Sequence, residues 1–378
     1  VQLGGRPMMR SGEVLETVPG MIVSQHSGEG KANQYYLRGF NLDHGTDFAT
    51  TLAGIPVNTP TGAHAHGYAD ATFLIPELVG GVQFKKGPYF ADEGDFSAAG
   101  AANINYLNVL NRPLLNLSAG EEGWGRVLAA VSPRIGAGTL LAALEVNRMD
   151  GPWQRPDDYE KINGVVRYIR GDNRNGVSIT GMSYQADWNS TDQVPQRAID
   201  SGLITRFGNL DDSDGGKAGR HSVVADVQRS FGANSIRGSG YFLRNRLTLF
   251  SNFTYFLDDP VAGDQFEQSE ERSTAGGRVT FRRLHRWAGR HAESAAGVQV
   301  RRDWLDPVGL YHTSARRRIA TVREDEVDQT MTGVYGQTEI EWSRTARTTF
   351  GLRADLYQFS VTADVPENSG RGSKALAS

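Results

Sequence analysis

The sequence predicts a mainly β protein in which a small N-terminal domain of mixed α/β type precedes a large antiparallel barrel. Three observations lead to this prediction. The first part of the chain is irregular, with Gly, Pro, Asn and His interrupting short apolar runs. The second part is a train of segments that alternate apolar and polar residues, and its connections alternate between short and long. We therefore expect two domains, over residues 1–112 and 113–378.

Two short helices are expected in the first domain. Ser11 is a plausible N-cap for an apolar stretch that includes Val14 and Leu15, and Pro19 ends it. A second helix is expected over residues 70–79, with Asp70 as its cap.

The second domain shows the two-residue period of strands with one apolar face. Leu144 and Val146 share one face, and Glu145 and Asn147 share the other. A face that carries charges cannot be a second dry core, so the apolar face is the one that we expect to meet lipid. About eleven such strands, each of roughly 9–11 residues, suit a tilted membrane strand. They begin near Leu114, Gly125, Thr139, Ile162, Gly176, His221, Ser235, Arg278, Ala292, Thr332 and Thr348.

The connections support an outer-membrane barrel, which has short periplasmic turns and long extracellular loops. Short turns are expected at 132–138, 171–175, 232–234 and 343–346, and long loops at 150–161, 187–220, 250–272 and 306–329. Residues 366–370 look like the start of another long loop. Because a closed bacterial barrel has an even number of strands, this reads as a truncated barrel.

The composition excludes several classes of function for this chain. The net charge of −3 gives no basic field for nucleic acid, and the lack of cysteine excludes disulfides and thiol chemistry. No run of about 18 apolar residues is present, so no membrane-spanning helix is expected. No catalytic motif is found, and we expect neither an enzyme nor a cofactor. The N-terminus lacks the pattern of a signal peptide, so we interpret it as cut.

Four pieces of the first domain, in this order, resemble the plug domain of TonB-dependent outer-membrane receptors. They are Val18-Pro19-Gly20, Leu37-Arg38-Gly39-Phe40, the hairpin from Thr51 to Asn58, and Val82–Pro88 followed by Ala101–Asn105. The hairpin turn reads Ala53-Gly54 where the family usually has Asp-Gly, and no TonB box precedes the plug. The resemblance is close over the plug, whereas over the strands it rests on pattern alone.

The resemblance implies a plug followed by about 11 of an expected 22 barrel strands. It implies an outer-membrane receptor, expected to be monomeric, for TonB-energised uptake of a scarce nutrient, a metal or a metal chelate such as a siderophore. The implied partners are the TonB complex, the lipid bilayer with its lipopolysaccharide, and a small-molecule or metal-chelate ligand. The alternatives are a passive porin and a soluble secreted β-sandwich that binds a ligand.

The resemblance also singles out Arg38 of the Leu-Arg-Gly-Phe motif as a residue that seats the plug. Its expected partners are carboxylates of the barrel wall such as Glu145, Glu339 or Glu341. The alternative is a solvated arginine at the end of a strand.

His64 and His66 form the most distinctive local feature. In an extended chain, residues two apart project to the same side, where imidazoles can share a Zn, Cu or Ni ion. The alternative is a pair of hydrogen-bonding histidines that pack the plug against the wall. The resemblance places the ligand-binding apex of the plug at Asn41, Asp43, His44, Asp47, His64, His66 and Tyr68.

Arg316, Arg317 and Arg318 lie in an expected long loop. They have the charge to attract anionic chelates or lipopolysaccharide phosphates, and the alternative is a solvated loop.

Overall fold

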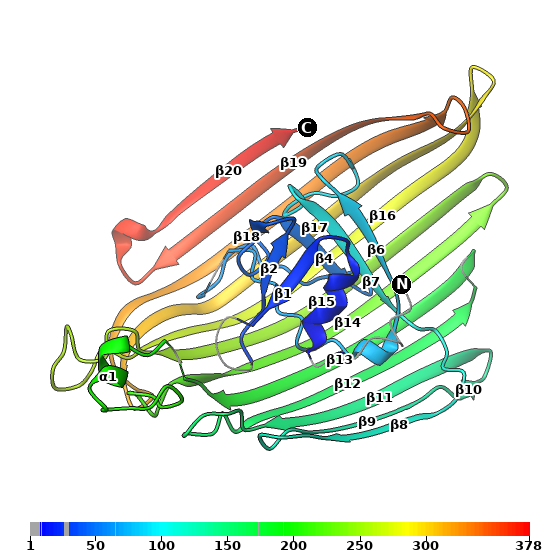
Figure 1. Cartoon of the computed structure of the whole chain (residues 1–378). Helices are drawn as coiled ribbons and strands as arrows, with labels where there is room; N and C mark the ends of the chain where they lie inside the picture. The colour runs from blue at the N-terminus through cyan, green and yellow to red at the C-terminus, as the bar shows by residue number, and fades with distance from the viewer. Residues whose placement is uncertain (1–7, 9, 26–29, 65, 173, 192) are drawn as a thin grey trace.

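The computed structural model describes residues 8, 10–25, 30–64, 66–172, 174–191 and 193–378. A large curved sheet forms a wall, and a compact N-terminal domain lies against one of its faces (Figure 1). The expected boundary at 112 falls between the last strand of the N-terminal domain and the first strand of the wall. No helix among the described residues is long and apolar enough to cross a membrane.

In its described residues, the N-terminal domain contains two small sheets and two 3₁₀ helices. An antiparallel sheet has the order β1 (Met21–Ser24), β2 (Gln34–Leu37), β3 (Phe40–Asn41). A mixed sheet has the order β5 (Ile55–Pro56), β4 (Phe48–Leu52), β7 (Gly100–Tyr106), β6 (Val79–Lys86), in which β4 and β7 are parallel. The helices are η2 (Ser11–Thr17) and η3 (Pro76–Leu78). Leu52, Ile55 and Ile104 are fully buried, so alternate residues of the mixed sheet form the core.

Both helix predictions need correction. Arg10, not Ser11, holds the N-cap position of η2, and no side chain caps that helix. The helix expected over 70–79 is reduced to η3. The Asp70 carboxylate instead accepts hydrogen bonds from the Thr72 amide (2.8 Å) and hydroxyl (2.5 Å), which closes a local turn that competes with a helix.

Across the described residues, the wall is one antiparallel sheet with thirteen strands, and it contains all eleven expected strands. Its strands are β8 (Leu114–Ala119), β9 (Gly125–Val131), β10 (Arg134–Ile135), β11 (Gly138–Met149), β12 (Tyr159–Gly171), β13 (Asn175–Asn189), β14 (Gly215–Phe231), β15 (Asn234–Ser251), β16 (Phe266–Trp287), β17 (Arg290–Ser314), β18 (Arg317–Glu341), β19 (Arg347–Ala363) and β20 (Gly370–Ala377). Helices α1 (Gln196–Asp200) and η4 (Pro366–Asn368) lie in connections. The short β10 and β20 were not expected, and β20 begins where a long loop was predicted.

Several strands run far beyond the expected length. The loop predicted at 306–329 is mostly strand, because β17 and β18 continue to a tight turn at residues 315 and 316. The sequence of β18 in this region, RRIATVREDEVDQ, carries polar residues on both faces. Apolar alternation disappears where both faces of a strand meet water, so the pattern ended before the strand did.

The alternation within the wall is confirmed, with the apolar side chains pointing outward. Leu144 and Val146 are 51% and 46% exposed. Glu145 and Asn147, which alternate with them along β11, are buried on the side of the N-terminal domain. The same order holds on β19, where Phe350 and Leu352 are exposed. An apolar outer face with a polar inner face is the pattern of a barrel wall that meets lipid.

Candidate functional site

Arginines on the inner face of the wall hold the N-terminal domain by its main chain. Arg220 of β14 donates through Nη2 to the Pro56 carbonyl oxygen at 3.0 Å. Arg301 of β17 donates through Nη1 to the Asn58 carbonyl oxygen at 2.8 Å. Because the acceptors are carbonyl oxygens, these contacts depend on the path of the chain and not on its side chains.

The contacts continue along the same segment on β16. Arg272, whose side chain is completely buried, donates through Nη2 to the Thr61 carbonyl oxygen. Its Nη1 lies 3.1 Å from an oxygen of Asp303, which also pairs with Arg301. The Glu270 carboxylate accepts a hydrogen bond from the Ala63 amide at 2.8 Å. We call residues 56–63 the seating segment.

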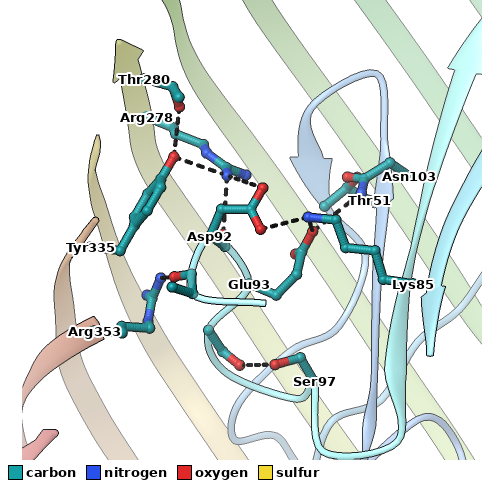
Figure 2. Close-up of polar contacts among 12 residues, drawn as sticks. Thr51, Lys85, Asp92, Glu93, Ser97, Asn103, Arg278, Thr280, Tyr335 and Arg353 are labelled. Carbon is teal, nitrogen blue, oxygen red and sulfur yellow. Dashed lines mark hydrogen bonds and ion pairs between the residues drawn. The ribbon is translucent and has the colours of Figure 1, made fainter. Parts of the chain in front are cut away.

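A second plug element, the loop between β6 and β7, inserts toward β16 and carries Asp92 (Figure 2). Arg278 donates to the Asp92 carbonyl oxygen at 3.0 Å, and Lys85 lies 2.6 Å from the Asp92 carboxylate. Burial opposes ionisation of this carboxylate, but Lys85 and Arg278 outweigh burial and lower the pKa of Asp92. The ionised Asp92 carboxylate therefore anchors the loop among polar and basic side chains.

The wall side of this pocket is itself fixed by hydrogen bonds. The Tyr335 hydroxyl lies 2.8 Å from the Thr280 hydroxyl and accepts a hydrogen bond from Arg278 at 3.2 Å (Figure 2). Arg353 of β19 donates to the Ala91 carbonyl oxygen at 3.1 Å. Gln299 of β17 also donates to the Asp92 carbonyl oxygen, at 2.9 Å, so four consecutive wall strands, β16–β19, carry residues that hold the plug loop or the groups that bind it.

Arg38 does not have the position that the sequence predicted. It is exposed, and it forms no ion pair within the described part of the chain. Arg38 and Gly39 have φ of 51° and 85°, the left-handed conformation of a two-residue hairpin turn between β2 and β3. Glu145, one of its expected partners, pairs instead with the wall residues Arg126 (2.6 Å) and Lys161 (3.1 Å). Arg126 also donates two hydrogen bonds to the carboxylate of the plug residue Glu77, at 2.5 and 2.9 Å. The ion pair between plug and wall is thus made by a wall arginine and a plug carboxylate, the reverse of the expected arrangement.

Three of the expected ligand residues form a cluster of rings. The ring centroids of His44 and His64 are 5.2 Å apart, and Tyr68 lies 5.6 Å from each. His64 Nδ1 is 2.9 Å from Gln268 Oε1, and the Gln268 amide donates to the Ala63 carbonyl oxygen at 2.6 Å. The ring cluster therefore lies near the start of β16, on the side of the wall where the connections are long.

The remaining expected ligand residues lie at the surface. Asn41, Asp43, Asp47 and His66 are exposed, and Asp43 approaches His44 at 3.9 Å. Among the described residues, no group of three or more His, Cys, Asp or Glu side chains is in place to hold a metal ion. Metal binding by His64 and His66 stays a prediction.

A cavity of about 210 Å³ lies between the plug and strands β15–β19. Its lining includes Asn58 of the seating segment, Asp95 and Phe96 of the plug loop, and Arg301 and Tyr357 of the wall. Burial raises the pKa of Asp95. Phe96 has a φ of 64°, an uncommon conformation for a bulky residue and one that is often found at functional sites.

Two polar residues, the buried Gln265 and the partly buried Arg316, tie together the connections on this side of the wall. Gln265, which is 1% exposed, accepts hydrogen bonds from the Thr313 hydroxyl and the Arg316 amide. Its amide nitrogen donates to the Ser213 hydroxyl at 2.7 Å. Arg316 donates to the Ser213 carbonyl oxygen at 2.6 Å and to Asn189 at 2.9 Å. The connections β13–β14, β15–β16 and β17–β18 are thereby joined into one body, the loop lock.

This arrangement corrects the expectation for the three arginines. Arg316 is an internal tie of the loop lock, and Arg318 is paired with Glu267 at 2.7 Å. They do not form a shared basic patch, because two of the three guanidinium groups are already bound within the protein.

Comparisons with known proteins agree with this architecture. A family model described as "TonB-dependent Receptor Plug Domain" matches residues 2–101. The ferric citrate transporter FecA in its unliganded form superposes with a TM-score of 0.79 at 12% identity, over 99% of this chain and 57% of that one. The copper transporter OprC gives 0.71 at 18% identity, over 98% of this chain and 57% of its own.

The ferric yersiniabactin uptake receptor FyuA from Yersinia pestis gives a TM-score of 0.70 at 12% identity, over 97% of this chain and 58% of its own. The chain thus spans somewhat more than half the length of these structures. Residues 2–101 thus match the plug domain of TonB-dependent receptors, and the chain as a whole has the fold of these outer-membrane receptors, with a plug seated against a polar inner wall and an apolar outer face.

Proposed function

We propose that this chain belongs to a receptor that takes up a metal chelate through the interior of its barrel, with energy supplied by the TonB complex. The observation that carries the proposal is the seating of residues 56–63 on Arg220, Arg301 and Arg272. Through these contacts, separate hydrogen bonds hold the plug against the inner face of the wall. An external force can break such bonds one after another, and the wall keeps its own hydrogen bonds while they break.

The ligand is proposed to be captured on the side of the long connections. The ring cluster of His44, His64 and Tyr68 and the cavity beside Asp95 lie between the plug and the wall there. Imidazole, phenol and carboxylate groups suit a metal centre or the polar periphery of a chelate. The similar structures include a ferric citrate transporter, a copper transporter and a ferric yersiniabactin uptake receptor, which supports a ligand of this class.

Accumulation of labelled ferric and copper chelates in whole cells tests this function. Cells that produce the receptor are compared with the same cells lacking TonB. We expect uptake of at least one chelate against its gradient only where TonB is present. Equal uptake with and without TonB would indicate a passive pore instead.

A further inference from the structure

One buried side chain of the seating segment, that of Asn58, binds the main chain of other plug segments. Asn58 is 2% exposed. Its Nδ2 donates to the carbonyl oxygens of Gly45 at 2.7 Å, Phe48 at 3.0 Å and Gly67 at 3.3 Å. Its Oδ1 accepts a hydrogen bond from the Thr50 amide at 2.7 Å. Both polar atoms of the side chain are therefore used, and each partner belongs to the main chain.

Two glycines let a single amide group reach two loops at once. Gly45 and Gly67 have φ of 115° and 70°, in the left-handed region that glycine adopts readily. A Cβ added to Gly45 would lie 2.7 Å from the Ala69 Cβ, so the loops approach too closely for a larger residue. The Ala69 amide also donates to the His44 carbonyl oxygen at 2.7 Å. The two loops are thus packed backbone to backbone around the Asn58 amide.

These two loops carry the ring cluster. His44 directly precedes Gly45, and Tyr68 directly follows Gly67. The His44 and Tyr68 ring centroids are 5.6 Å apart. Because each peptide unit is rigid, a group that fixes the Gly67 carbonyl also fixes the backbone at which Tyr68 begins. The spacing of the rings therefore depends on the carbonyl oxygens that Asn58 holds.

The main chain of Asn58 is bound to the wall, whereas its side chain binds the ring-bearing loops. Arg301 donates to the Asn58 carbonyl oxygen at 2.8 Å. An amide side chain is suited to this place because it is neutral and offers two N–H donors and one acceptor oxygen. A carboxylate of the same shape would present only acceptors to three carbonyl oxygens.

We propose that Asn58 is a positioning residue that sets the geometry of the ring cluster and fixes it relative to the wall. This inference rests on the proposed function, which assigns ligand binding to the ring cluster. Metal-binding side chains are oriented by the groups behind them, and loss of such a group lowers metal affinity by roughly 10–100-fold. Asn58 supplies this orientation through the backbone of the two loops.

Modification of histidine by diethyl pyrocarbonate tests the positioning without any ligand. The rate at the buried His44 is measured by peptide mass spectrometry in the detergent-solubilised receptor, with the exposed His66 as internal reference. The variants are Asn58→Asp, which places a charge against the carbonyl oxygens, and Asn58→Ser, which is neutral and keeps one hydroxyl. We expect His44 to react about tenfold faster in both, because the loops open more often once these hydrogen bonds are lost. If Asn58→Asp does not fold, Asn58→Ser still gives the answer.

The matched control is Asn103→Asp, at another amide of the plug. Asn103 accepts a hydrogen bond from Thr51 at 2.6 Å and donates to Glu93 at 3.5 Å, and both partners lie outside the ring-bearing loops. We expect His44 to stay protected in this control. Calorimetry with copper nitrilotriacetate and ferric citrate then measures affinity. The chelate that the unmodified receptor binds should bind roughly 10–100-fold more weakly to the Asn58 variants and equally well to the control.

Three outcomes would overturn the proposal. Unchanged reactivity of His44 in both variants would show that Asn58 does not hold the loops. Equal exposure of His44 in Asn103→Asp would show a general loosening of the plug. Full affinity in variants whose His44 has become reactive would show that ring geometry does not set affinity. If the unmodified receptor binds neither chelate while His44 reacts faster only in the Asn58 variants, the positioning stands and the proposed function fails.

Discussion

Arg301 reaches across 243 positions of sequence to donate a hydrogen bond to the Asn58 carbonyl oxygen at 2.8 Å. The same guanidinium group pairs with Asp303 at 2.7 Å through Nε and at 2.9 Å through Nη2. One wall residue thus binds the plug with one nitrogen and is itself held by the wall with the other two. This relationship explains how the seating segment, which carries no charged side chain, is held by a charged residue of the wall.

Replacing Arg301 by Ala removes this contact and leaves the buried Asp303 with Arg272 as its remaining basic neighbour. Breaking a buried pair from one side costs on the order of 3–5 kcal/mol, so we expect a clear fall in the temperature of thermal unfolding in detergent. Arg302→Ala is the control, because its pair with Asp328 is half exposed and costs about 0–1 kcal/mol. Equal losses in the two variants would contradict the seating role of Arg301.

The ionisation of Asp92 gives the plug loop a pH dependence. Its pKa is lowered in the folded protein, so it stabilises the loop above its unfolded value of about 4. This stabilisation is lost as the pH falls through the lowered pKa. Hydrogen exchange of loop amides should show faster exchange in Asp92→Asn than in the unmodified receptor at pH 7, with the difference shrinking below about pH 4. Asp47→Asn, at an exposed plug position, serves as the control. A difference independent of pH would contradict a role for the charge.

The loop lock depends on Gln265. The Gln265→Ala substitution removes the acceptor of Thr313 and Arg316 and the donor to Ser213, so the connections should separate. We expect faster cleavage by added protease within residues 193–214, with little change in thermal unfolding, because the strands themselves are untouched. Gln196→Ala lies in the same connection and loses only one exposed bond, to Asp200. Similar cleavage of both variants would show that Gln265 does not join the connections.

Glycines in the wall make room for tyrosine rings. A Cβ added to Gly297 would lie 2.5 Å from the hydroxyl oxygen of Tyr335, the residue that binds Thr280 and Arg278. We expect Gly297→Ala to displace this ring and to cost about 1–3 kcal/mol in thermal unfolding. Gly336→Ala, one strand away, meets its nearest atom at 4.0 Å and should be tolerated. If both substitutions were tolerated equally, ring packing over Gly297 would not contribute to stability.

The sequence was a reliable guide wherever the solvent differs between the two faces of a strand. The alternation of apolar Leu144 and Val146 with charged Glu145 correctly indicated which face of the strand is outward. Every expected wall strand was found. The pattern failed above the apolar band, where water meets both faces and the long β17 and β18 resembled loops. It also failed at Asp70, where a side chain bonded to the main chain made a turn of an expected helix.

The plug contacts were predicted less well, for a related reason. The resemblance singled out Arg38, which is exposed at a hairpin turn, while the seating arginines lie in the wall. A signal for them was present, because Arg301 and Asp303 are two residues apart and so share one face of a strand. Arg353 and Asp355 repeat the spacing. Which main-chain carbonyls these residues bind depends on contacts between distant segments, and strand periodicity does not report such contacts.

The most direct test of the proposed function is calorimetric titration of the detergent-solubilised receptor with ferric, copper, nickel and zinc chelates. The unmodified receptor is compared with His64→Ala, His66→Ala and the double variant. We predict tight binding of at least one chelate, weakened by His64→Ala because His64 lies in the ring cluster with His44 and Tyr68. The effect of His66→Ala alone shows whether this exposed histidine contributes. No binding of any chelate to the unmodified receptor, or binding unchanged in the double variant, would contradict capture of a metal chelate at the ring cluster.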